Sequence, residues 1–141
     1  MRRSEVLVKD LMKKDVTTLG RNDSLDMAEG LMVLGRIRHV PVLDDDGKVV
    51  GIVSSRDLFR SALAFALGYG EKGRGSLLKT VKVKEVMREP VFTIGPDATV
   101  AQAALVMVEQ KVGCLPVVQD GRMVGIVTQT DLLRHVIATR T

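Results

Sequence analysis

An internal repeat constrains this chain of 141 residues more than any other feature of its sequence. The segment V-K-D-L-M at residues 8–12 returns as V-K-E-V-M at residues 83–87. The segment G-K-V-V-G-I-V-S at residues 47–54 returns as G-R-M-V-G-I-V-T at residues 121–128, after a deletion of one residue in the second copy. Because the register holds from one end of each copy to the other, the sequence predicts one supersecondary unit built twice.

Each copy has the pattern of a β-α-β-β-α unit. An extended segment is followed by apolar residues at helical spacing, and the N-cap of that helix is Ser24 or Asp23 in the first copy and Thr99 or Asp97 in the second. Two apolar runs then flank an Asp-Gly pair, which predicts a β-hairpin because glycine accepts the positive φ of a tight turn. A last helix is predicted over residues 56–67 and again over residues 129–138.

The domain organisation follows from the repeat. We expect repeat 1 at residues 8–67, repeat 2 at residues 81–139, and between them a glycine-rich linker at residues 68–80 that forms a mobile surface loop. One copy alone has too small a core to be stable, so we expect the two to pack sheet against sheet. The fold class is therefore α+β, with two tandem βαββα repeats.

Composition and charge exclude several classes of function. Aromatic residues make up only 3% of the chain and the net charge is only +4, so binding to nucleic acid is not expected. Cys114 is the single cysteine, which allows no internal disulfide and favours a cytoplasmic protein. With two histidines and one cysteine far apart in sequence, no metal site is expected, and neither a membrane span nor a catalytic triad or acid–base pair is visible.

The sequence S/T-x-x-D marks the start of the last helix of each copy. It places Asp57 three residues after Ser54, and Asp131 three residues after Thr128. A carboxylate at a helix start can accept two hydrogen bonds from the cis-diol of a ribose, while the hydroxyl group and free helix N–H groups can meet a phosphate. The same spacing is also a capping box, which needs no ligand, and both interpretations stay open because a carboxylate has several acceptor sites.

Taken in order, V-x-D/E-h-M, a Thr in the first strand, h-P-V and G-I-V-S/T-x-x-D resemble the cystathionine-β-synthase (CBS) domain in both copies and over nearly the whole chain. A tandem pair of such domains is called a Bateman module. The resemblance implies a βαββα fold for each copy, pseudo-two-fold symmetry between the copies, and a disc-like homodimer of two pairs. It also implies clefts between the copies that bind AMP, ADP, ATP or S-adenosylmethionine.

Carrying the family's cleft over to this chain gives two unequal sites, each shared between the copies. The preferred site has small residues around the base, a hydroxyl and a carboxylate on the ribose, and cationic groups toward the phosphate: Thr93, Val112, Gly113, Cys114 and Pro116; Ser54 and Asp57; Arg38, His39 and Arg56. The second site has bulkier residues near the base, and its phosphate end has no cation because Gly113 and Cys114 stand there. Its residues are Thr18, Ile37, Arg38, His39, Pro41, Thr128, Thr130 and Asp131. We therefore expect the first site to bind more tightly.

These expectations describe a non-catalytic regulatory module that binds an adenine nucleotide, with AMP as the first choice and ADP or ATP as possible ligands. No other cofactor is expected. The alternatives are a dimerisation or interaction module that binds no small molecule, and a sensor of S-adenosylmethionine. The expected partners are a second copy of the chain and a downstream protein that the sequence does not name.

Overall fold

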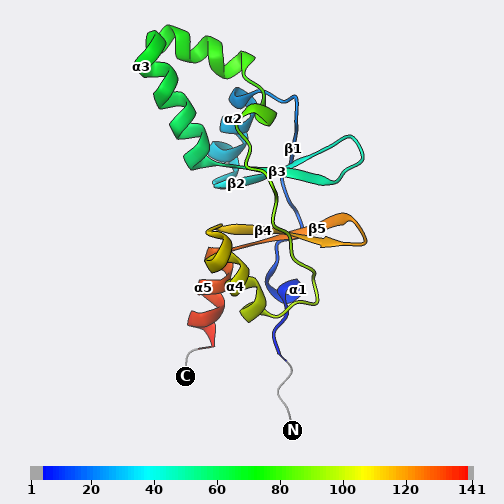
Figure 1. Ribbon diagram of the computed structural model, residues 1–141. Coiled ribbons are helices and arrows are strands. Elements are labelled where there is room, and N and C mark those ends of the chain that lie inside the picture. Colours follow the sequence, from blue (N-terminus) through cyan, green and yellow to red (C-terminus); the bar gives the residue numbers. More distant parts are fainter. Residues whose placement is uncertain (1–4, 140–141) are drawn as a thin grey trace. The chain divides into compact units, whose positions relative to one another are not determined.

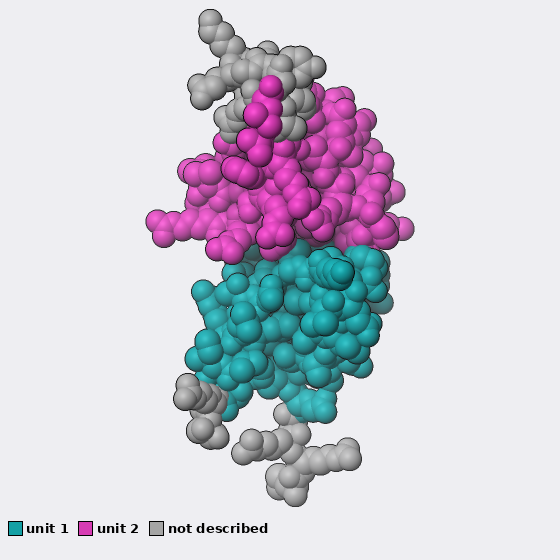
Figure 2. All heavy atoms as spheres, turned by 60° about the vertical axis from the view of Figure 1, so that its left-hand side comes forward, with its two compact units in different colours: residues 1–16, 92–141 teal, residues 17–91 magenta. Residues whose placement is uncertain are grey.

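The computed structural model describes residues 5–139, and within that range every side chain except those of residues 64–66 and 68–77. The chain divides into two compact units (Figure 2). The central unit is Thr17–Val91, and the terminal unit combines Met1–Val16 with Phe92–Thr141. Each repeat therefore contributes its first segment to the unit that contains the rest of the other repeat.

Backbone hydrogen bonds explain this exchange of segments. In the terminal unit the N–H groups of Val8 and Lys9 donate to the carbonyls of Ala98 and Pro96, at 2.8 and 3.0 Å. In the central unit the N–H groups of Val83 and Lys84 donate to the carbonyls of Asp23 and Arg21, at 2.8 and 3.0 Å. The V-x-D/E-h-M segment thus docks before the helix of the other copy, a pairing that its position in the sequence does not reveal.

The central unit contains a three-stranded sheet in the order β1-β2-β3 (Figure 1). The short β1 (Leu19–Gly20) runs parallel to β2 (His39–Leu43), and β2 pairs antiparallel with β3 (Val49–Ser54). Helix α2 (Leu25–Gly35) connects β1 to β2, α3 (Ser55–Thr80) follows β3, and the 3-10 turn η1 (Val83–Glu85) comes last.

The terminal unit repeats this arrangement with small differences. Helix α1 (Val8–Leu11) is the equivalent of η1, and α4 (Val100–Gln110) precedes the hairpin of β4 (Cys114–Gln119) and β5 (Arg122–Thr128). A single parallel bridge from Ile94 to Val117 stands where the central unit has β1, and α5 (Gln129–Ala138) ends the described chain. The predicted order of elements is confirmed, with the first strand of the second copy reduced to this bridge.

The predicted caps and turns are present. Ser24 and Thr99 are the N-caps of α2 and α4, where their side-chain oxygens accept from the N–H groups of Met27 and Gln102. Both hairpin turns contain a glycine with positive φ, +80° at Gly47 and +79° at Gly121. These positions fix the register of both hairpins.

The expected linker loop at residues 68–80 is wrong: α3 continues as a helix through this segment to Thr80. Once the apolar first half of α3 has nucleated the helix, each further residue adds a hydrogen bond, and a glycine costs only about 1 kcal/mol relative to alanine. The far end is held by Leu78, which is 5% exposed and belongs to the core of the central unit. The sequence G-x-G-x-x-G at residues 68–73 therefore lies within a helix and not in a phosphate-binding loop.

Each unit has its own aliphatic core. In the central unit, Leu25, Val40, Val42 and Val53 are fully buried. In the terminal unit the corresponding positions are held by residues such as Leu115, Val117 and Val127. Met87 packs on Gly51 and Met12 packs on Gly125, so the methionine of each V-x-D/E-h-M segment lies against the core of its unit.

Candidate functional site

The start of the helix after each hairpin is a complete capping box. In the central unit the N–H and hydroxyl of Ser54 donate to Asp57 Oδ2 at 3.2 and 2.7 Å, and the Asp57 N–H donates back to Ser54 Oγ at 3.2 Å. In the terminal unit the N–H and hydroxyl of Thr128 donate to Asp131 Oδ2 at 2.8 and 3.0 Å, and the Asp131 N–H donates to Thr128 Oγ1 at 3.3 Å. The capping interpretation is therefore confirmed, and in both carboxylates it uses only the Oδ2 atom.

The other oxygen of each carboxylate has different surroundings in the two units. Arg88 Nε lies 3.4 Å from Asp57 Oδ1 and forms an ion pair with it. Asp131 makes no ion pair with any residue in the part of the chain that the structure describes, although it is only 9% exposed. The two helix starts are thus alike in their caps and unlike in their charge environment.

The start of β2 and the residue before it bring two more of the predicted residues next to the capping box of Ser54 and Asp57. His39 lies opposite Ser54 in the register of β2 and β3, and the Ser55 N–H donates to the carbonyl of Arg38 at 2.8 Å. The chain therefore gathers Arg38, His39, Ser54, Asp57 and Arg88 within one unit. We call these five residues the Asp57 cluster.

Electrostatics in the Asp57 cluster favour a neutral histidine. Burial lowers the pKa of His39 below its ordinary value, the positive charge of Arg38 lowers it further, and Arg88 adds to this effect. The carboxylate of Asp57 opposes the shift without reversing it. At neutral pH the cluster thus presents two guanidinium groups, one carboxylate and an uncharged imidazole.

Arg88 is the member of this cluster that sequence reasoning missed. It belongs to the second repeat by sequence but to the central unit by packing. A signal was available, because the residue after V-x-D/E-h-M is cationic in both copies, Lys13 in the first and Arg88 in the second. Without knowledge of the exchanged segments, nothing linked that position to Asp57.

In the terminal unit, small uncharged residues stand where the central unit has Arg38 and His39. Cys114 lies opposite Thr128 across β4 and β5, and the Gln129 N–H donates to the Gly113 carbonyl at 2.8 Å. Burial raises the pKa of the Cys114 thiol to about 12, so the sulfur stays protonated and is not a nucleophile. Gly113 and Cys114 hold the places that Arg38 and His39 hold in the central unit.

The remaining predicted residues differ in their exposure. Arg56 and Thr130 are exposed in the first turns of α3 and α5, and Thr93 is exposed before the bridge at Ile94. Thr18, Ile37 and Val112 are half-buried, whereas Pro41 and Pro116 are fully buried. Both predicted sites combine residues of the two units, and their meeting in a shared cleft stays a prediction.

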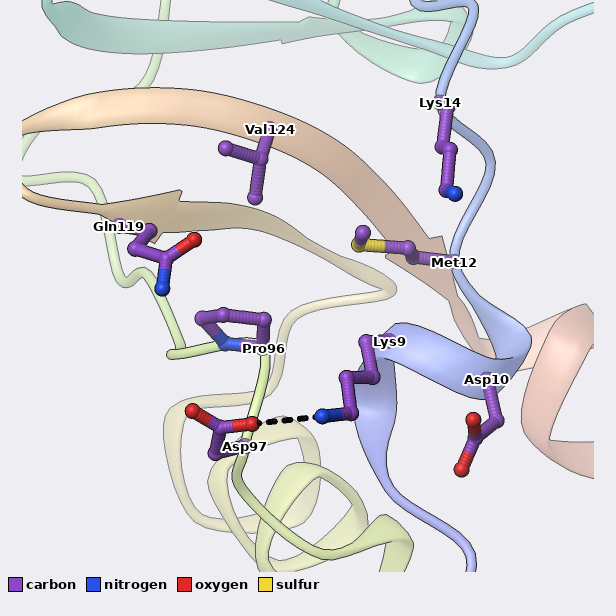
Figure 3. Close-up of a pocket in the computed structure, with 8 residues that line it drawn as sticks. All are labelled: Lys9, Asp10, Met12, Lys14, Pro96, Asp97, Gln119 and Val124. Carbon is purple, nitrogen blue, oxygen red and sulfur yellow. Dashed lines mark hydrogen bonds and ion pairs between the residues drawn. The ribbon is translucent and has the colours of Figure 1, made fainter.

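A hollow of about 490 Å³ opens on the terminal unit, away from the predicted residues. Figure 3 shows Lys9 of α1 reaching toward Asp97, with which it forms an ion pair at 3.1 Å. The lining combines both signs of charge with apolar groups: Lys9, Asp10, Met12, Lys14, Pro96, Asp97, Gln119 and Val124. Because both members of the ion pair are well exposed, the pair contributes little to stability.

Neither a metal cluster nor a membrane-spanning helix is found among the described residues. Among residues 5–139 without the side chains of 64–66 and 68–77, there is no group of three or more His, Cys, Asp or Glu side chains placed to hold a metal ion. Over the same residues, no helix combines the length and the hydropathy that crossing a bilayer requires.

Comparison with known proteins identifies the repeats. The sequence profile of the CBS domain matches residues 8–64 and 83–138. A CBS domain-containing protein of Dictyostelium discoideum is 36% identical over 92% of this chain and 90% of its own length. The homoserine O-acetyltransferase of Methanohalobium evestigatum is 32% identical over 93% of this chain, but the match covers only 24% of that enzyme.

A solved structure agrees with the sequence comparison. The CBS domain pair of protein MJ0100, in complex with 5′-methylthioadenosine and S-adenosyl-L-methionine, is 30% identical to this chain with a TM-score of 0.81. That match covers 97% of this chain and 100% of the other. The order of elements, the duplicated S/T-x-x-D capping boxes and these similarities together show that the chain belongs to the CBS domain family, as a pair of CBS repeats.

Proposed function

We propose that this CBS pair is a non-catalytic regulatory module that binds an adenine nucleotide, with AMP as the preferred ligand and ADP or ATP as alternatives. The observation that carries the proposal is the Asp57 cluster, in which a helix-start carboxylate is paired with Arg88 and the charge of a second guanidinium group, that of Arg38, acts on the neighbouring His39. A carboxylate suits the cis-diol of a ribose, and guanidinium groups suit a phosphate. A ribose 5′-phosphate carries both groups on one small molecule.

Charge favours a nucleotide over S-adenosylmethionine. The solved pair of protein MJ0100 holds 5′-methylthioadenosine and S-adenosyl-L-methionine, so an adenosyl group is a ligand of a related pair. In the present chain Arg38 and Arg88 lie near His39 and Asp57, where they would repel a sulfonium cation and attract a phosphate. A sensor of S-adenosylmethionine is therefore the second candidate.

The proposed binding site is composite. The base would lie against Thr93, Val112, Gly113 and Cys114 near Pro116, with the ribose on Ser54 and Asp57 and the phosphate toward Arg38, His39 and Arg56. The second site would use Thr18, Ile37, Arg38, His39 and Pro41 with Thr128, Thr130 and Asp131. Gly113 and Cys114 support the order of affinity, since small side chains leave room for a flat base and the first site alone has the cations for a phosphate.

We also propose that the partner is a second copy of the chain. The helices expose the same apolar surface twice, because Val33, Phe59 and Leu63 on α2 and α3 correspond to Val108, Leu133 and Ile137 on α4 and α5. Leu34 and Leu67 enlarge it in the central unit, at 86% and 81% exposure. A surface that one chain carries in duplicate can meet its equivalent on a second chain, as a symmetric dimer requires.

Dimerisation without a small-molecule ligand is the alternative that this apolar surface favours. The charged residues of the Asp57 cluster argue against it, because a purely structural surface needs no gathering of two guanidinium groups, an imidazole and a carboxylate. A downstream protein would receive the signal of the module. The buried, protonated thiol of Cys114 suits the reducing cytoplasm, which we propose as the location.

A thermal-shift panel tests the proposed function. A ligand that binds only the folded state raises the melting temperature, by an amount equivalent to about 2.7 kcal/mol at a hundredfold excess over Kd. We expect AMP to give the largest shift, followed by ADP and ATP, with smaller shifts for S-adenosylmethionine and 5′-methylthioadenosine. A panel in which none of these compounds changes the melting temperature would leave the dimerisation module as the better account.

A further inference from the structure

The two helix-start carboxylates differ in how many acceptor positions they have left. A carboxylate offers about four lone-pair positions in total. On Asp131, Thr128 uses two of them. On Asp57, Ser54 uses two and Arg88 uses a third. A cis-diol donates two hydrogen bonds, so it finds room on Asp131 but not on Asp57 while Arg88 is in place.

Arg88 combines a fixed backbone with an exposed side chain. Its N–H donates to the Ile52 carbonyl at 2.9 Å and its carbonyl accepts from the Ile52 N–H at 3.4 Å, which ties it to β3 just before Ser54. The preceding Met87 packs on Gly51. The side chain of Arg88 is nevertheless 52% exposed, whereas that of Asp57 is 11% exposed. The guanidinium group can therefore leave the carboxylate while the residue itself stays in place.

The surroundings of Asp57 favour the entry of an anionic group, to which the guanidinium group of Arg88 can move. The charges of Arg38 and Arg88 both act on His39, so an anionic group that enters the cluster meets the field of two guanidinium groups. In the terminal unit the equivalent positions hold Gly113 and Lys13, and no described residue forms an ion pair with Asp131. Of the two helix starts as the described residues show them, that of the central unit has both an ion-paired carboxylate and a second cation nearby.

We propose that Arg88 makes ligand binding at Asp57 depend on a phosphate. In the free protein Arg88 occupies Oδ1 of Asp57, and a bound nucleotide draws the guanidinium onto its phosphate and frees Oδ1 for the ribose. Uncharged adenosine must break the ion pair without replacing it, so it binds poorly. Asp131 forms no ion pair with a described residue, so it accepts the ribose of an uncharged adenosyl compound as readily as that of a nucleotide. This inference rests on the proposed function.

Calorimetric titrations with adenosine and AMP test the role of Arg88. At the tighter AMP site of the wild-type protein, we expect AMP to bind about a hundredfold more tightly than adenosine, since a charge-assisted pair to the phosphate replaces the one to Asp57. In Arg88→Ala, we expect the AMP affinity to fall roughly tenfold and the adenosine affinity to rise several-fold, because an acceptor position on Asp57 becomes free. The preference for AMP then nearly disappears.

Two variants serve as controls. Lys13→Ala removes the equivalent cation of the other repeat and should leave the preference for AMP unchanged. Arg88→Lys keeps the positive charge on a less suitable group, so its preference should lie between those of the wild type and Arg88→Ala. If Arg88→Ala lowers both affinities by one common factor, or changes neither, Arg88 has a structural role or none and the inference is overturned.

The same titrations separate the failure of this inference from the failure of the proposed function. If the wild-type protein binds neither compound, the proposed function is wrong and the role of Arg88 is overturned with it. If Asp57→Ala abolishes tight AMP binding while Arg88→Ala keeps the wild-type preference, the nucleotide site stands and only the role of Arg88 is wrong.

Discussion

His39 couples the stability of the central unit to pH. Burial and the neighbouring Arg38 lower the pKa of the folded imidazole below the value of 6.5 that applies to the unfolded chain. Between these two values the unfolded chain binds more protons than the folded one, so the free energy of unfolding increases with pH across that window. The contribution is complete above pH 6.5 and is lost as the pH falls through the folded value.

Urea unfolding at several pH values from 5 to 7.5 measures this contribution. We expect the unfolding free energy of the wild type to fall more steeply below pH 6.5 than that of His39→Gln, in which the titrating group is absent. His135→Gln is the matched control and should keep the wild-type slope. Parallel curves for the wild type and His39→Gln would show that the environment of His39 is not as the structure has it.

At the scale of single residues, the sequence predicted the groups that depend on local spacing. Ser54 and Asp57, like Thr128 and Asp131, form their capping boxes because three residues separate the members of each pair. Arg88 was not predicted, because its ion pair with Asp57 joins residues that are 31 positions apart. Such a contact depends on where a distant segment docks, which no local pattern encodes.

The contact between each V-x-D/E-h-M segment and its strand explains a glycine in both hairpins. A Cβ atom built at Gly125 of β5 would lie 2.8 Å from the Lys13 carbonyl oxygen and 2.7 Å from Met12 Sδ. A methionine can move aside, but a backbone carbonyl that is bonded to Ile126 cannot do so easily. Gly125→Ala should therefore loosen the docked N-terminal segment.

We expect Gly125→Ala to lower the free energy of unfolding by about 1–3 kcal/mol, as overpacking in a core does. Gly30→Ala is the control, because nothing lies within 4 Å of the added Cβ atom within α2, and it should stabilise the protein by about 0.5–1 kcal/mol. Urea unfolding measures both changes. Equal effects of the two substitutions would contradict the close approach at Gly125.

At the scale of elements, patterns predicted the type of each helix and strand better than its length. The helix caps and the hairpin turns were predicted because each depends only on residues close by in sequence, as at Ser24, Thr99 and the turn glycines. The end of α3 was misjudged because its glycines suggested a loop. Burial of Leu78 in the core outweighs that preference, and tertiary packing of this kind routinely overrides propensity.

The exchange of first segments between the repeats is a property of the whole molecule. The central unit, residues 17–91, contains the first segment of the second repeat. The terminal unit contains the first segment of the first repeat, because residues 1–16 belong with residues 92–141. An alignment of the two copies predicts their shared fold but not which copy each segment packs against. Contacts between the repeats had to come from the structure.

The apolar surfaces of the helices predict assembly of two chains. Phe59 on α3 and Leu133 on α5 are 68% and 56% exposed and hold equivalent positions in the two repeats. Light scattering coupled to size-exclusion chromatography should give a dimer mass for the wild type and a monomer mass for the double variant Phe59→Glu, Leu133→Glu, because charges in an apolar interface are unfavourable. Lys48→Glu on the exposed hairpin is the control and should stay dimeric. A monomeric wild type would contradict this assignment.

The affinity for AMP of Asp57→Ala, compared with that of Asp131→Ala, tests the central claim most directly. Both substitutions remove one carboxylate and one capping box, so their effects on the two helix starts are matched. Two hydrogen bonds to a charged acceptor contribute roughly 3 kcal/mol, so calorimetry should show tight binding weakened about a hundredfold in Asp57→Ala and retained in Asp131→Ala. Unchanged AMP affinity in Asp57→Ala, or an equal loss in both variants, would contradict a ribose site at Asp57.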